Sequence, residues 1–143
     1  MVDCVTQNSK PIILIIEDDE QYRGFLCELL QVTGFNTISA KNGKEGIMLY
    51  KNANPDLVLT DIVMPEMDGF EVVQTILSYN KNTPLIAMSG YSKVSESSYL
   101  NMISMLGADA ILSKPINSLK LIETINKTLK NKTMDASLAQ HNN

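Results

Sequence analysis

The chain has 143 residues, with a hydrophobic content of 44%, a charged content of 20% and a formal net charge of -4. A chain of this length buries about two-thirds of the surface that its unfolded form exposes, so we expect one globular domain. The acidic balance and the single arginine, Arg23, argue against a nucleic-acid-binding surface. We find no secretory signal and no apolar run of about 20 residues, which predicts a cytoplasmic protein without membrane contact.

Strand and helix patterns alternate five times along the chain. After a loose polar segment at residues 1–10, an apolar run at 12–16 predicts a strand, and apolar residues at helical spacing follow it to about residue 33. Further strands are expected at residues 35–39, 57–60, 85–88 and 110–113, each followed by a helical pattern. This order predicts an α/β fold over residues 11–130, with a parallel sheet between two helix layers. Residues 131–143 are expected to form a frayed tail.

Charged residues follow three of the predicted strands. Glu17 and Asp18 come after the first, Asp61 after the third and Lys114 after the last. The carboxyl ends of parallel strands meet in the crevice where open α/β sheets bind ligands. Oxygen ligands without His or Cys favour a hard cation, and a shallow carboxylate site suits Mg²⁺. The combination indicates a site for Mg²⁺ and a phosphoryl group, although one acidic pair alone is typical of solvated strand ends.

Asp61 is the candidate nucleophile of this site. A carboxylate can attack a phosphoryl group and form an acyl phosphate, and Asp61 leaves a buried strand directly before a loop that contains Pro and Gly. Lys114 would place a mobile positive charge near a phosphoryl oxygen, and Ser89, after the fourth strand, would donate a hydroxyl hydrogen bond to another. Taken alone, Lys114 and Ser89 are each also typical of an ordinary turn.

Four motifs together resemble the receiver domain of two-component response regulators. They are ILIIEDDE at residues 13–20, LVLTDIVMPEMDGFE around Asp61, Met88-Ser89-Gly90, and Gly107-Ala108-Asp109 with Leu112-Ser113-Lys114-Pro115. The resemblance extends over residues 11–130. It implies a flavodoxin-like (βα)5 three-layer sandwich whose five parallel strands lie in the order 2-1-3-4-5. It also implies a stand-alone receiver, since nothing after the fifth helix resembles an effector domain.

The resemblance implies a role for each matching residue. Asp61 matches the phosphoaccepting aspartate, and it lies 43 residues after Asp18, which matches the direct or water-mediated Mg²⁺ ligand. Lys114 matches the lysine of the motif, and Ser89 matches the switch hydroxyl that moves toward the phosphoryl group. The implied catalytic set is Asp61, Lys114 and Ser89, and the implied metal set is Glu17, Asp18, Asp61 and the backbone carbonyl of Val63.

The resemblance also implies partners. A histidine kinase or a histidine phosphotransfer protein would present phosphohistidine to Asp61. The added charge would then change a protein-interaction surface, formed by the fourth helix, the last strand and the last helix, for a downstream target. The chain would act in a phosphorelay as a phosphoacceptor and not as an enzyme, with self-assisted transfer and slow autodephosphorylation only. The sequence leaves open a monomer or a weak dimer through the last two helices.

Two features depart from the family pattern. Ile111 stands where many receivers carry an aromatic residue, and isoleucine cannot make the same inward ring movement. Lys114 lies 25 residues after Ser89, a longer separation than expected, which predicts extra length within residues 90–98. Tyr91, in that segment, is a candidate replacement for the missing aromatic ring. Val63 and Tyr91 are also bulky enough to hinder water near an acyl phosphate, which predicts slow self-dephosphorylation.

Other functions remain as alternatives. A phosphorylation-independent interaction module of the same fold would usually lack one of the site residues, and all are present here. A Mg²⁺-dependent phosphatase with an aspartyl nucleophile would need an acid two residues after Asp61, where this chain has Val63. A nucleotide-binding flavodoxin-like protein is disfavoured because the first strand-to-helix turn is acidic rather than glycine-rich, and an acidic turn would repel phosphate in the absence of a metal.

Overall fold

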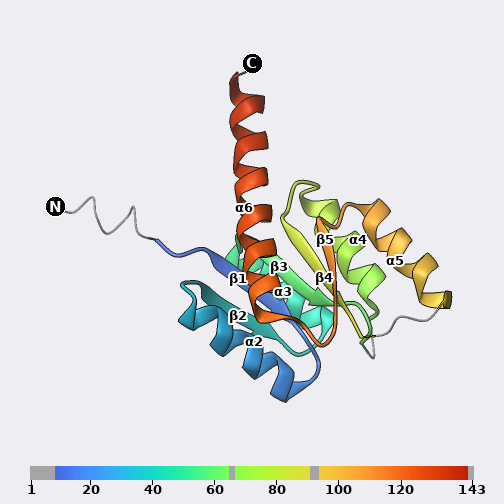
Figure 1. The fold of residues 1–143 in the computed structure, drawn as a ribbon. Coiled ribbons are helices and arrows are strands. Elements are labelled where there is room, and N and C mark those ends of the chain that lie inside the picture. The colour runs from blue at the N-terminus through green and yellow to red at the C-terminus, as the bar shows by residue number, and fades with distance from the viewer. Residues whose placement is uncertain (1–8, 65–66, 91–93, 142–143) are drawn as a thin grey trace.

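A computed structural model of the chain describes residues 9–64, 67–90 and 94–141. Within these ranges five strands alternate with five helices (Figure 1), as the sequence predicts. The elements are β1 (Ile12–Ile16), α2 (Glu20–Val32), β2 (Asn36–Ala40), α3 (Gly43–Ala53), β3 (Leu57–Asp61), α4 (Gly69–Tyr79), β4 (Leu85–Ser89), α5 (Val94–Leu106), β5 (Ala110–Ser113) and α6 (Ser118–His141).

The strands form one parallel sheet in the order β2-β1-β3-β4-β5, so the predicted topology is confirmed. Every residue of β3 and β4 is buried, and the apolar runs show no alternation because helices cover both faces of the sheet. The strand order reverses between β1 and β3. The carboxyl ends of these two neighbours therefore border the crevice in which such sheets bind ligands.

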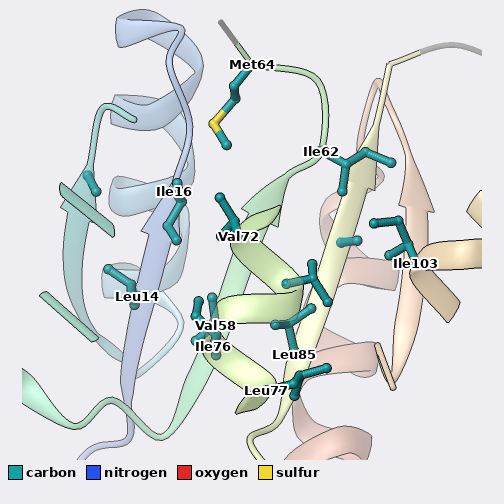
Figure 2. Packing of buried hydrophobic residues seen from close by; sticks show 13 residues of the cluster. Leu14, Ile16, Val58, Ile62, Met64, Val72, Ile76, Leu77, Leu85 and Ile103 are labelled. Carbon is teal, nitrogen blue, oxygen red and sulfur yellow. The ribbon is translucent and has the colours of Figure 1, made fainter. Parts of the chain in front are cut away.

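Helices cover the two faces of the sheet in two groups (Figure 1). Residues of α3, α4 and α5 pack with one set of strand side chains, which includes Leu14, Ile16 and Val58 (Figure 2). Residues of α2 and α6 pack with the other set, which includes Ile13 and Ile15. Successive residues of β1 thus contribute to opposite clusters, as the period of two along a strand requires.

Polar side chains fix where three of the helices begin. Asp19, Asn42 and Asp68 are the N-caps of α2, α3 and α4, and each side chain accepts hydrogen bonds from backbone N–H groups of the first turn. The cap at Asp19 has a consequence for the carboxyl edge of the sheet. Because α2 begins at Glu20, Glu17 and Asp18 remain in the short turn between β1 and this helix.

The sequence predicts a frayed tail at residues 131–143, and in the structure α6 extends to His141 within this segment. The sequence after Ser118 contains no glycine or proline, so no local signal interrupts the helix. Lys132 Nζ also lies 3.3 Å from Asp109 Oδ1, which ties the extended helix to the start of β5. Although α6 has 24 residues, neither it nor any other described helix is apolar enough over a sufficient length to cross a membrane.

Smaller differences concern the strand ends. β2 begins one residue later than predicted, at Asn36. β3 and β4 each extend one residue further, so that Asp61 and Ser89 are the last residues of strands and do not lie in the following loops. The predicted extra length at residues 90–98 falls partly on residues 91–93, outside the described part of the chain, and α5 begins at Val94.

Candidate acidic site at the carboxyl edge of the sheet

The carboxyl ends of β1, β3 and β5 bring three carboxyl groups and a lysine together. Carboxylate oxygens of Glu17, Asp18 and Asp61 lie within 4.8 Å of one another. Lys114 Nζ lies 2.7 Å from Glu17 Oε1 and 3.3 Å from Asp61 Oδ2. The four residues predicted to meet, which lie at the ends of three different strands, therefore form one cluster.

The cluster has a buried floor and an exposed rim. Glu17 and Asp61 are only 1% and 4% exposed, whereas Asp18 is exposed and Val63 is 48% exposed. The N–H group of Val63 donates a hydrogen bond to Asp61 Oδ1 (3.2 Å), while Oδ2 faces Lys114. The Asp61 carboxyl group is thus held at both oxygens, and the exposed residues Asp18 and Val63 belong to the same site.

Burial dominates the electrostatics of Glu17. The pKa of this carboxyl group is raised from the ordinary 4.5 to about 7, because burial and the nearby charge of Asp61 together outweigh the opposing hydrogen bonds from Lys114 and from the Asp19 N–H. Burial alone would lower the pKa of Lys114. The hydrogen bond to Glu17 and the charge of Asp61 outweigh it and raise the lysine pKa above 10.5.

The donor set fits a hard divalent cation. Its members are carboxylate oxygens, which Mg²⁺ prefers, and the ammonium group of Lys114 pairs with only two of the three carboxyl groups, those of Glu17 and Asp61. At an effective dielectric constant of 20, two like charges about 4 Å apart repel by about 4 kcal/mol, so a cation between them relieves a considerable cost. Val63, whose carbonyl is the fourth predicted ligand, is kept beside the cluster by its hydrogen bond to Asp61.

Ser89 and Ile111 occupy the two positions that the sequence analysis connects with switching. Ser89 ends β4 at the same edge of the sheet, is 1% exposed, and its carbonyl accepts the Lys114 backbone N–H (2.7 Å). Ile111 is half-buried and packs against the cluster formed with α3, α4 and α5. Tyr91, the proposed substitute for an aromatic ring, lies outside the described residues.

Tyr22 is one of the residues at helical spacing that follow the first strand, and it makes a contact with the site that this spacing does not predict. Lys114 Nζ lies 4.7 Å from the centroid of the Tyr22 ring, and the Tyr22 hydroxyl accepts a hydrogen bond from the Ile116 N–H (3.2 Å). Asp19, three residues earlier, is an N-cap signal that could have located the start of the helix. Helical periodicity cannot predict that the Tyr22 ring faces a lysine that lies far away in the sequence.

The sheet order defines a flavodoxin-like α/β fold, and its carboxyl edge carries an acidic cluster with a lysine. A model of the response regulator receiver domain matches residues 13–126, so the chain belongs to the response regulator receiver domain family. Receiver domains bind Mg²⁺ at an acidic pocket and interact with histidine kinases and downstream targets. They are phosphoacceptor signalling modules.

Individual relatives support this assignment. The chain is 32% identical over 119 residues to the polar-differentiation response regulator DivK of Brucella anthropi, covering 82% of this chain and 94% of DivK. It is 36% identical over 115 residues to the autoinducer 1 sensor kinase/phosphatase LuxN of Vibrio campbellii, covering 79% of this chain but 13% of LuxN. The crystal structure of a CheY-like receiver domain protein from Methanospirillum hungatei superposes with a TM-score of 0.82 at 28% identity, covering 89% and 99% of the two chains.

The raised pKa of Glu17 predicts a pH-dependent stability in the absence of metal. The folded protein binds the Glu17 proton between about pH 4.5 and 7 whereas the unfolded chain does not, so the free energy of unfolding falls as pH rises through this interval. Glu17→Gln should remove this slope and stabilise the metal-free protein at pH 8 by about 1 kcal/mol. Urea unfolding in a chelator between pH 5 and 8 measures both effects.

Glu28→Gln is the matched control, because Glu28 is exposed on α2 and the chemical change is the same. This control should keep the wild-type pH slope. A Glu17→Gln variant that is less stable than the wild type at pH 8 without metal would show that the Lys114 pairing outweighs the burial of the carboxylate.

Proposed function

We propose that the chain is a phosphorelay receiver that accepts a phosphoryl group on Asp61 from the phosphohistidine of a histidine kinase or a histidine phosphotransfer protein. The observation that supports this most directly is the placement of Asp61. Its carboxyl group ends the central strand β3, faces Lys114 Nζ at 3.3 Å and lies within 4.8 Å of two further carboxyl groups. The sensor kinase LuxN and the response regulator DivK among its relatives support the same assignment.

In the proposed reaction, an Asp61 carboxylate oxygen attacks the phosphorus of phosphohistidine. The P–O bond forms, the P–N bond breaks, and the electron pair leaves with the imidazole. Lys114 offsets the charge that gathers on the phosphoryl oxygens, and the Ser89 hydroxyl donates to one of them. Glu17, Asp18, Asp61 and the Val63 carbonyl would hold Mg²⁺. When bound, this ion lowers the repulsion between the attacking carboxylate and the phosphoryl group.

The proposed output is a change in the surface formed by α5, β5 and α6. Met102 and Met105 on α5 are exposed, and a hollow of about 330 Å³ between β5 and α6 is lined in part by Lys120, Thr124 and Lys127. The hydrogen bond from the Lys114 N–H to the Ser89 carbonyl connects β4 to the end of β5. A movement of Ser89 toward a phosphoryl group would therefore displace the end of β5, which is part of this surface. We propose that a downstream protein binds to this surface.

Incubation with acetyl phosphate and Mg²⁺ tests the proposed function. The protein should gain the mass of one phosphoryl group, hydroxylamine should remove it as expected of an acyl phosphate, and a chelator should prevent its addition. No modification under these conditions would favour the phosphorylation-independent module. Capture of partner proteins with and without beryllofluoride then shows whether the modified form binds differently, and turnover of a phosphomonoester would instead support the phosphatase.

The lifetime of the phosphorylated protein is a separate prediction. Val63 is 48% exposed and hydrogen-bonded through its N–H to Asp61, and its apolar side chain offers no hydrogen bond to an attacking water. We expect a half-life of many minutes in Mg²⁺ alone, and we expect Val63→Asn to shorten it. The loss of acyl phosphate after removal of the donor measures both. A half-life of seconds for the wild-type protein would contradict the prediction.

A further inference from the structure

Tyr22 contacts the lysine of the acidic site in two ways. It lies in the first turn of α2, where Asp19 Oδ1 accepts hydrogen bonds from the N–H groups of Gln21 and Tyr22 (3.0 and 3.1 Å) and fixes the backbone. The Tyr22 ring lies 4.7 Å from Lys114 Nζ, and its hydroxyl accepts the Ile116 N–H at 3.2 Å. One side chain therefore reaches both the ammonium group and the backbone two residues beyond it.

Lys114 needs such a contact because its ammonium group is on a flexible four-carbon chain. Its other partners are the carboxylates of Glu17 and Asp61, at 2.7 and 3.3 Å. Under the proposed function, both carboxylates change partners when a cation and a phosphoryl group arrive. The attraction between an ammonium group and the face of a neutral ring does not depend on those changes. The contact with Tyr22 can thus hold Lys114 in place throughout the reaction.

We propose that Tyr22 is a positioning residue, which holds the ammonium group of Lys114 beside the carboxyl group of Asp61 during phosphoryl transfer. The ring orients the ammonium group, and the hydroxyl fixes the segment that connects β5 to α6. This inference rests on the proposed function of Asp61 and Lys114. The alternative is that Tyr22 only fills apolar space beside Phe25, whose ring centroid lies 5.9 Å away.

Phosphorylation of a set of variants by acetyl phosphate distinguishes a positioning role of Tyr22 from simple filling of apolar space. A small donor excludes effects on the docking of a kinase. Tyr22→Leu should lower the phosphorylation rate constant about tenfold and Tyr22→Phe about twofold, because phenylalanine keeps the ring and loses only the hydroxyl. In a Lys114→Ala background, Tyr22→Leu should have no further effect, since a residue that acts through Lys114 cannot act without it.

Phe25→Leu is the matched control. Phe25 lies on the same helix, is 46% exposed and touches Tyr22, whereas no described contact joins it to Lys114. Its rate constant should remain within about twofold of the wild type. A wild-type rate for Tyr22→Leu, or an equal loss with and without Lys114, would overturn the proposal.

A second readout does not depend on phosphorylation. In the metal-free protein, the ring current of Tyr22 should shift the NMR signals of the Lys114 ε-methylene protons upfield. Tyr22→Phe should retain this shift and Tyr22→Leu should lose it. If the wild type accepts no phosphoryl group, the proposed function fails while this measurement still tests the contact. Unchanged Lys114 signals in Tyr22→Leu would disprove the contact itself.

Discussion

Asp61→Asn is expected to abolish phosphorylation by acetyl phosphate. The amide of asparagine cannot form the acyl phosphate, and the substitution also removes one of the three carboxyl groups of the acidic cluster. We expect the rate of phosphoryl incorporation to fall by at least about 100-fold, at the limit of detection by intact-protein mass. The fold should persist, because the asparagine side chain would keep an oxygen to accept the hydrogen bond that Val63 donates.

Asp68→Asn provides the control for this substitution. Asp68 is an exposed residue, and its side chain caps α4 by accepting from the Glu71 N–H (3.0 Å). Asparagine is about as good an N-cap as aspartate, so this variant should incorporate the phosphoryl group at the wild-type rate. Unchanged phosphorylation of Asp61→Asn would mean that the acceptor is another residue.

Gly69→Ala is expected to destabilise the protein severely. A Cβ atom at this position would lie 2.2 Å from the Cα atom and 2.7 Å from the carbonyl oxygen of Ile62, which are backbone atoms that cannot move aside. The Gly69 N–H also donates to that carbonyl at 3.1 Å, so a shift that relieves the clash loses a hydrogen bond. We expect the free energy of unfolding to fall by about 3 kcal/mol, as measured by urea denaturation.

Gly24→Ala should have the opposite effect. Gly24 lies within α2, and an added Cβ atom would meet no other atom within 4 Å. Because alanine favours a helix more than glycine does, we expect a gain of about 0.5–1 kcal/mol. If Gly69→Ala left the unfolding free energy within about 0.5 kcal/mol of the wild type, the close approach at Ile62 would be wrong.

The strands were predictable from the sequence where an apolar run with clear boundaries is also buried in the structure. The apolar run at residues 12–16 is bounded by Pro11 and Glu17, and it coincides with β1 (Ile12–Ile16). The end of α6 was not predictable in this way. Its last two turns lack the apolar periodicity on which the sequence analysis relied, and the Lys132–Asp109 pair joins residues that periodicity cannot connect.

The composition of the acidic cluster was predictable from strand ends, but its internal pairing was not. Topology alone places Glu17, Asp61 and Lys114 at one edge of the sheet. Which carboxylate the lysine approaches more closely depends on side-chain geometry, and the structure gives 2.7 Å to Glu17 against 3.3 Å to Asp61. The position of Tyr22 beside the lysine depends on the same geometry.

The continuation of α6 affects where this protein can be shortened. Thr128 is buried, Leu129 packs against the apolar cluster beneath α2 and α6, and Lys132 pairs with Asp109; all three lie beyond residue 126, where the family match ends. A truncation at that boundary would uncover part of the core next to β5, which is an edge strand of the sheet. We therefore expect the smallest stable unit to reach at least Lys132, and experiments on a shortened receiver should retain that residue.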